Sequence, residues 1–110
     1  MNVYDTANKL ASEIKTTEEY KSYKIAKEAM SLRPEIKEQI QKFETARYEV
    51  QLQLMQTGKN DEQKLKEMQS LYIELMKQEE VEKYFEAETR FNILVADINK
   101  IIGEAIRDVM

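Results

Sequence analysis

The chain contains no cysteine and no histidine, and these two absences exclude most of the chemistry that small protein sites use. Structural zinc, iron–sulfur clusters, haem ligation, thiol nucleophiles and Ser-His-Asp triads all need one of these residues. A ferritin-type carboxylate metal pair also needs a Glu-x-x-His sequence. We therefore expect no cofactor, no bound metal and no enzymatic activity. The lack of cysteine is also typical of proteins from a reducing cytoplasm.

Residues that form turns are scarce as well, with only 2 Gly and 1 Pro among 110 residues. A β-sandwich needs many more of them. Hydrophobic residues make up 42% and charged residues 35%, which is too apolar for a disordered chain and suits helices with charged outer faces. A chain of this length holds one modest core, so residues 1–110 are predicted to form a single all-helical domain.

Long apolar runs are also missing, and the N-terminus MNVYDTANKL has no pattern of a signal peptide. We expect a cytoplasmic protein with no membrane insertion. The formal net charge is −4, whereas a nucleic-acid binder usually has a basic excess. Direct contact with nucleic acid is therefore not the first expectation.

Apolar residues repeat at spacings of three and four, and this pattern predicts about five helices. Asp5 is suited to cap the first helix. Thr16 and Glu19 have the spacing of a capping box for the second, which ends near SLRP. The apolar faces of these two helices consist of Val3, Ala7, Leu10 and Ile14, and of Tyr20, Tyr23, Ala26 and Met30.

Pro34 suits the first turn of a third helix, because its missing N–H has no partner to lose there. Gly58 is suited to end that helix, and Asn60 with Gln63 to cap a fourth. The apolar face of the third helix, like that of the others, forms a seam along the helix, and this seam is interrupted by one charged residue, Arg47. The apolar faces of the two helices consist of Ile36, Ile40, Phe43, Val50 and Leu54, and of Leu65, Met68, Tyr72 and Leu75.

A shift in the phase of the apolar stripe near residues 78–80 predicts a break before the last helix. A helix over 80–109 would be roughly 45 Å long, against about 34 Å for the diameter of a compact chain of this size. We therefore expect an elongated bundle with a long C-terminal helix, whose broad apolar stripe is covered by a second copy in a homodimer. The candidate interface consists of Phe91, Asn92, Val95, Ile98, Asn99 and Ile102.

The polar residues of the last helix separate by helical phase. Arg90, Asp97 and Glu104 share the face opposite the seam, which is typical of a solvated charged face. Asn92 and Asn99 lie one heptad apart on the flank of the seam. They either fix the register of two helices through hydrogen bonds, as polar residues do in coiled coils, or are simply hydrated.

Two charged residues fall within apolar seams, Arg47 in the third helix and Glu88 in the last. Opposite charges that are each alone in an apolar stripe suggest an ion pair. We predict an Arg47–Glu88 pair, within one chain or across the dimer, that sets the packing register. A carboxylate active site around Glu88 is the weaker alternative, because no histidine or metal motif accompanies it.

The second helix carries a small basic and aromatic patch that consists of Tyr20, Lys21, Tyr23, Lys24 and Lys27. Such a patch is able to contact RNA, although the interspersed glutamates favour a solvated face. Four of the six methionines most simply fill gaps in a helical core, with a methionine-lined groove for a partner helix as the alternative. They are Met30, Met55, Met68 and Met76.

Three stretches taken together, LASEIKTTEEYKSYKIAKEAM, RPEIKEQIQKFE and VEKYFEAETRFNILVADINKII, resemble the YlbF/YmcA family of small helical bacterial proteins. The last stretch is most similar to the YheA-like branch, where Glu-Ala-Glu-x-Arg and Asn-Lys-(Val/Ile)-Ile recur. The matching residues here are Glu86, Ala87, Glu88 and Arg90, and Asn99, Lys100, Ile101 and Ile102.

The resemblance implies a self-associating, all-helical cytosolic protein related to regulators of competence, sporulation and biofilm development. Those relatives act in a complex that modulates messenger-RNA processing by an endoribonuclease, and they bind iron–sulfur clusters through cysteines. That cofactor does not carry over to a chain without cysteine. We therefore expect a non-enzymatic regulatory or adaptor protein that contacts other, unidentified proteins through its helices. The alternative is an RNA-contacting accessory factor.

Overall fold

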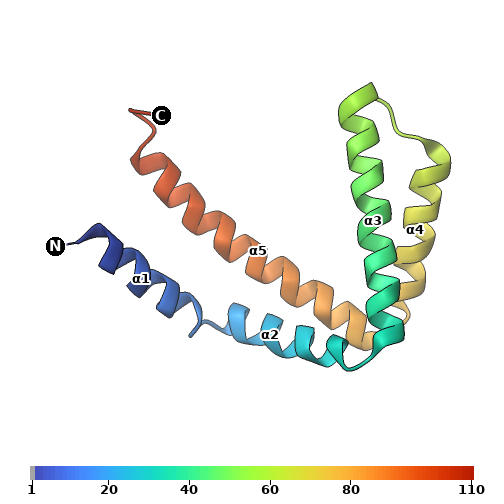
Figure 1. The fold of residues 1–110 in the computed structure, drawn as a ribbon, viewed down its shortest axis with the longest axis horizontal. Coiled ribbons are helices and arrows are strands. Elements are labelled where there is room, and N and C mark those ends of the chain that lie inside the picture. The colour runs from blue at the N-terminus through green and yellow to red at the C-terminus, as the bar shows by residue number, and fades with distance from the viewer. Residues whose placement is uncertain (1) are drawn as a thin grey trace. The chain divides into compact units, whose positions relative to one another are not determined.

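The computed structural model describes residues 2–110, and within this range the chain is all-α with five helices (Figure 1). The last helix is also the longest, as the sequence predicted. The helices are α1 (Val3–Ile14), α2 (Glu18–Ser31), α3 (Pro34–Thr57), α4 (Glu62–Met76) and α5 (Glu79–Ala105).

The first two helix starts differ from the predicted ones by a few residues. The side chain of Asn2, rather than Asp5, caps α1 and accepts a hydrogen bond from the Tyr4 backbone N–H at 2.8 Å. At the start of α2, the Tyr20 backbone N–H donates to the Thr17 hydroxyl at 3.2 Å. Since either of two adjacent threonines has the chemistry of a cap, the sequence pattern located this start only to within a residue.

The breaks on either side of α3 follow the prediction more closely. Pro34 is the first residue of α3, and Gly58 ends it with a φ of 72°, a left-handed conformation that glycine adopts without steric strain. The cap of α4 is Asp61 rather than Asn60, because the Asp61 carboxylate accepts from the Gln63 and Lys64 backbone N–H groups. The predicted break before the last helix is confirmed between Met76 and Glu79, although α5 ends at Ala105 and not at 109.

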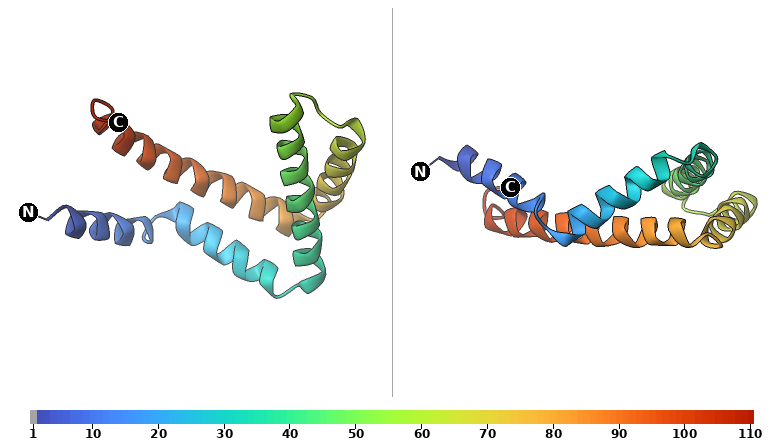
Figure 2. Two further views of the ribbon diagram at one scale, coloured as in Figure 1. Left: turned by 45° about the horizontal axis from the view of Figure 1, so that its top comes forward. Right: turned by 90° about the horizontal axis from the view of Figure 1, so that it is seen from below.

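The chain divides into two compact units. The hairpin unit consists of residues 28–83, in which α3 and α4 run antiparallel and pack along each other (Figures 1 and 2). Its core is well buried, since Ile36, Leu75 and Val81 have at most 1% of their surface exposed, whereas Met55 and Ile73 on its surface are exposed. The other buried residues of this unit are Met30, Ile40 and Phe43. An exposed ion pair between Arg33 and Glu80, with an N–O distance of 2.7 Å, also belongs to the hairpin unit.

The terminal unit consists of the described part of residues 1–27 together with residues 84–110. In this unit α2 runs beside the first half of α5 (Figures 1 and 2). Tyr84 and Ala87 are buried, whereas α1 contributes no buried residue. Every residue from 99 to 110 is exposed. The prediction of one domain over 1–110 stays a prediction, and so does the homodimer.

A helix able to span a membrane is not found within residues 2–110, because none there is both long enough and apolar enough.

Candidate functional site

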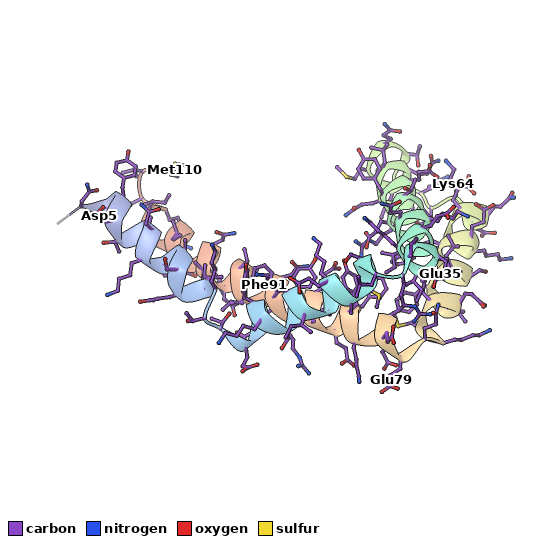
Figure 3. The ribbon with its side chains drawn as sticks, turned by 60° about the horizontal axis from the view of Figure 1, so that its bottom comes forward. Asp5, Glu35, Lys64, Glu79, Phe91 and Met110 are labelled. Carbon is purple, nitrogen blue, oxygen red and sulfur yellow. The ribbon has the colours of Figure 1, made fainter. Side chains whose placement is uncertain are left out.

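Four aromatic rings form a cluster in the terminal unit, between α2 and α5. The Phe91 ring lies 6.0 Å from Tyr20 and 5.6 Å from Tyr23, measured between ring centroids. The Tyr23 ring also lies 5.8 Å from that of Tyr84. Figure 3 labels Phe91 on α5, where it faces α2. Tilted and edge-on pairs at these distances are the arrangement that aromatic quadrupoles prefer. The cluster is therefore the packing centre that attaches α2 to α5.

Glu88 has a partner within this cluster. The Tyr23 hydroxyl donates to the Glu88 carboxylate at 3.4 Å, which is at the long end of the range for a hydrogen bond. Glu88 is half-buried, one turn after Tyr84. The carboxylate of Glu88 lies in the apolar seam of α5, and the hydroxyl of Tyr23 on the facing helix α2 gives it a hydrogen-bond partner there.

Arg47 has local partners in the hairpin unit. Its guanidinium forms an ion pair with Glu44, one turn earlier on α3, and its central carbon lies 5.5 Å from the centroid of the Phe43 ring. Both charged side chains are partly exposed. Since Arg47 and Glu88 each have a partner inside their own unit, the Arg47–Glu88 pair stays a prediction.

The six candidate interface residues of the last helix divide into three groups. Phe91 is engaged by the aromatic cluster, and Val95 and Ile98 are half-buried. Asn92, Asn99 and Ile102 are exposed. Further exposed apolar residues that the prediction left out of the interface are Ile93, Ile101, Ile106 and Val109. The breadth of the apolar stripe was the signal that could have included them.

The basic and aromatic patch of α2 also contains both exposed and half-buried residues. Lys21, Lys24 and Lys27 are exposed, and the Lys27 ammonium lies 5.6 Å from the centroid of the Tyr23 ring. The rings of Tyr20 and Tyr23 are half-buried, since they pack in the aromatic cluster. These rings are therefore engaged in packing and offer less area for stacking on a base. The RNA contact stays a prediction.

Two hollows were not predicted from the sequence. An open apolar hollow of about 410 Å³ lies on the α3–α4 pair, and its lining consists of Phe43, Arg47, Met68, Gln69, Tyr72 and Ile73. Met68 is the one of the four methionines that lines it. A smaller hollow of about 240 Å³ lies between α2 and α5 and is lined by Glu18, Glu19, Ser22, Ala87 and Arg90.

The titratable groups show little that resembles catalytic chemistry. Within residues 2–110, no group of three acidic, histidine or cysteine side chains is placed to hold a metal ion. The pKa of Arg33 is raised from its ordinary value, chiefly because its guanidinium donates a hydrogen bond to Glu80. A more basic arginine is simply a charged arginine, so this shift indicates a surface ion pair and no proton transfer.

Comparison with known proteins identifies the family, which the geometry of the site does not. Residues 3–107 match the family described as "Control of competence regulator ComK, YlbF/YmcA". A UPF0342 protein of Desulfitobacterium hafniense is 37% identical over 111 residues, which cover 100% of this chain and 89% of that protein. A UPF0342 protein of Symbiobacterium thermophilum is 36% identical, with 94% and 93% covered, and one of Lacticaseibacillus casei is 32% identical, with 98% and 95% covered.

Proposed function

We propose that this chain, which belongs to the YlbF/YmcA family, is a non-enzymatic regulatory protein that acts as a homodimer through helix-mediated contacts. The family is linked to control of the competence regulator ComK, and its description names no enzymatic activity. The narrower placement in the YheA-like branch, the cytoplasmic location and the role of an adaptor in bacterial development and messenger-RNA processing are part of the proposal.

The observation that carries this proposal is the exposed apolar surface of the terminal unit. Ile101 is 69% exposed and Val109 is 80% exposed, close to the exposed Ile102 and Ile106. At the other end of the chain, Val3 and Tyr4 of α1 are exposed as well. Several large apolar side chains left in water are typical of a surface where another protein binds. The hairpin unit also exposes apolar residues such as Met55 and Ile73, but it has a closed core of six buried residues, whereas the described part of the terminal unit buries Tyr84 and Ala87. We therefore take the terminal unit as the interaction surface.

A test of the regulatory role uses a bacterial host that carries ComK and this gene. Deletion of the gene should change the output of a ComK-dependent reporter several-fold, and the wild-type chain should restore it. Ile101→Glu with Ile102→Glu, which places charge on the exposed apolar end, should fail to restore it. Asp97→Lys, an exposed charge change on another face of α5, is the matched control and should restore it. Unchanged reporter output after deletion would contradict the proposal.

The second candidate function, contact with RNA, is favoured by the three exposed lysines of α2. If it holds, the chain binds a single-stranded RNA oligonucleotide with an affinity that falls as salt rises. Replacing Lys21, Lys24 and Lys27 together by glutamate should abolish that binding, whereas Lys64→Glu with Lys66→Glu on α4 should not. Binding that is equally weak for all three proteins would remove this candidate.

A further inference from the structure

The open apolar hollow on the α3–α4 pair has the volume and the lining of a small-molecule site. Its volume of about 410 Å³ lies within the range of roughly 300–1,000 Å³ that is typical of ligand pockets. Such pockets are mostly apolar with a few polar groups, and they occur between the helices of bundles. Four of the six lining residues here are apolar or aromatic, and the other two are Arg47 and Gln69. The proposed function makes no use of this hollow.

The hollow has two chemically different ends. The Phe43 and Tyr72 rings lie 5.6 Å apart between centroids, on helices that run antiparallel (Figure 1). Arg47 follows Phe43 by one turn on α3, and Met68 precedes Tyr72 by one turn on α4, so these two residues share the other end. The aromatic end consists of Phe43, Tyr72 and Ile73, and the charged end consists of Arg47, Met68 and Gln69.

Arg47 is the charged residue of this lining, and its present partner is weakly held. Its guanidinium lies against the Phe43 ring and forms an ion pair with Glu44 through Nη2. Both charged side chains are partly exposed, and such a pair one turn apart on a helix surface contributes little free energy. Because a guanidinium has five N–H donors, a ligand carboxylate is able to share or replace this partner. Phosphates with several charges suit a site with one cation less well.

The short extent of the hollow favours a small molecule over a partner helix. Its lining covers about one turn of α3, residues 43–47, and about one and a half turns of α4, residues 68–73. A helix that binds in a groove uses anchors at i, i+4 and i+7, which need two turns. The occupant that fits this length is a compound of a ring and a short acid group.

The aromatic end selects the body of that compound. Phe43 is 5% exposed and Tyr72 is 45% exposed, so the first ring lies deep and the second reaches the surface. Aromatic rings pair favourably when they are offset or edge-on, and a methionine sulfur such as that of Met68 also contacts a ring edge favourably. A flat ring also loses less conformational freedom on binding than an alkyl chain does.

We propose that the hollow on α3 and α4 binds an aromatic monocarboxylate, with its ring against Phe43 and Tyr72 and its carboxylate on Arg47. This inference goes beyond the proposed function and does not depend on the homodimer. Such a site gives a regulatory protein a chemical input through residues other than those of its interaction surface.

Cinnamate is the probe, and uncharged cinnamamide is its matched control. Nuclear magnetic resonance of protein with carbon-13 methionine methyl groups reports the contact, because Met68 lines the hollow whereas Met30 and Met110 do not. The Met68 signal, assigned with Met68→Leu, should shift in a saturable way, with a dissociation constant of roughly 1 mM or below for a compound of this size. Cinnamamide should bind at least about fivefold more weakly, because it lacks the charge-assisted hydrogen bonds.

Variants of the two ends test the proposed orientation. Arg47→Met should remove the preference for cinnamate over cinnamamide and leave cinnamamide binding unchanged. Glu44→Gln should tighten cinnamate binding about twofold, because the competing carboxylate is gone. Ile73→Ser should weaken both compounds alike. Arg107→Met and Ile93→Ser, which change exposed residues of the terminal unit, are the matched controls and should leave both compounds unaffected.

Several results would overturn this site. They are the absence of a saturable Met68 shift at millimolar cinnamate, equal binding of cinnamate and cinnamamide, and an unchanged preference in Arg47→Met. Nonanoate, which has the same numbers of carbon and oxygen atoms as cinnamate, should bind more weakly, and equal or tighter binding would overturn the aromatic class. A Met68 signal that shifts with protein concentration alone would show that a second copy covers the hollow. None of these results decides the reporter assay, so the proposed function is tested separately.

Discussion

The hairpin unit and the terminal unit differ in how they use their apolar side chains. In the hairpin unit the two helices are joined by a left-handed glycine and a capping aspartate, and core residues such as Ile36 and Leu75 are nearly inaccessible, although Tyr72 stays exposed. In the terminal unit α1 buries no residue, and the second half of α5 leaves isoleucines in water. The two regions are built from the same kind of amphipathic helix. The difference teaches that α3 and α4 build a shared core between them, whereas α1 and the end of α5 have no such core among the described residues.

The largest expected effect is in the core of the hairpin unit. Leu75 is 1% exposed, so Leu75→Ala should lower the free energy of unfolding by about 2–5 kcal/mol through lost burial and the cavity left behind. Ile101→Ala, in the exposed end of α5, should change it by less than about 0.5 kcal/mol. Urea denaturation measures both, and equal losses would remove the contrast between the two units.

A smaller effect is expected in the aromatic cluster. Phe91→Ala should lower the free energy of unfolding by about 1–3 kcal/mol, because a half-buried ring loses its burial and its contacts with Tyr20 and Tyr23. Phe91→Leu should lose less, since it keeps an apolar side chain. Thermal unfolding followed by circular dichroism measures both, with Ile93→Ala as the neighbouring exposed control. If Phe91→Ala resembles the control, the cluster does not hold α2 to α5.

The two glycines are expected to respond in opposite directions. Gly58→Ala should destabilise the chain by about 1–2 kcal/mol, because alanine is strained at a φ of 72°. Gly103→Ala should stabilise the chain by about 0.4–1 kcal/mol, because its backbone is helical and a Cβ there has space.

Urea denaturation of both variants measures the two changes. Equal losses for Gly58→Ala and Gly103→Ala would contradict the difference between a left-handed and a helical glycine.

The smallest effects are expected at the two charged seam residues. Tyr23→Phe should cost about 0.5–1 kcal/mol, because it removes the donor to Glu88. If the contacts with Glu44 and with Tyr23 are the ones that matter, Arg47→Met and Glu88→Gln should be additive within about 0.5 kcal/mol. A larger coupling energy would support the predicted Arg47–Glu88 pair. Unchanged melting temperatures for both single variants would end that hypothesis.

The positions of the helices followed from local patterns, and most of the local breaks did as well. Pro34 and Gly58 were assigned correctly because each constrains the backbone by itself, one through its ring and the other through its missing Cβ. The caps at Asn2, Thr17 and Asp61 were each misplaced, because neighbouring residues of similar chemistry compete for the same role.

The candidate site was less predictable. Helical phase identified Glu88 as an unusual seam residue, but nothing in the pattern indicated that Tyr23, 65 residues away, presents its hydroxyl to it. The ion pair of Arg33 with Glu80 and the two hollows were missed for the same reason. Each depends on which helices face one another, and periodicity describes only one helix at a time.

The sequence by itself determined that this protein is all-α, where its helices break, and which chemistry is closed to a chain without cysteine or histidine. These properties follow from covalent geometry and from the spacing of apolar residues, which act over a few neighbours. Only the tertiary structure decided which apolar stripes are buried within the chain and which stay in water. That distinction depends on contacts between distant residues, and it makes the end of α5 the surface through which we expect this protein to work.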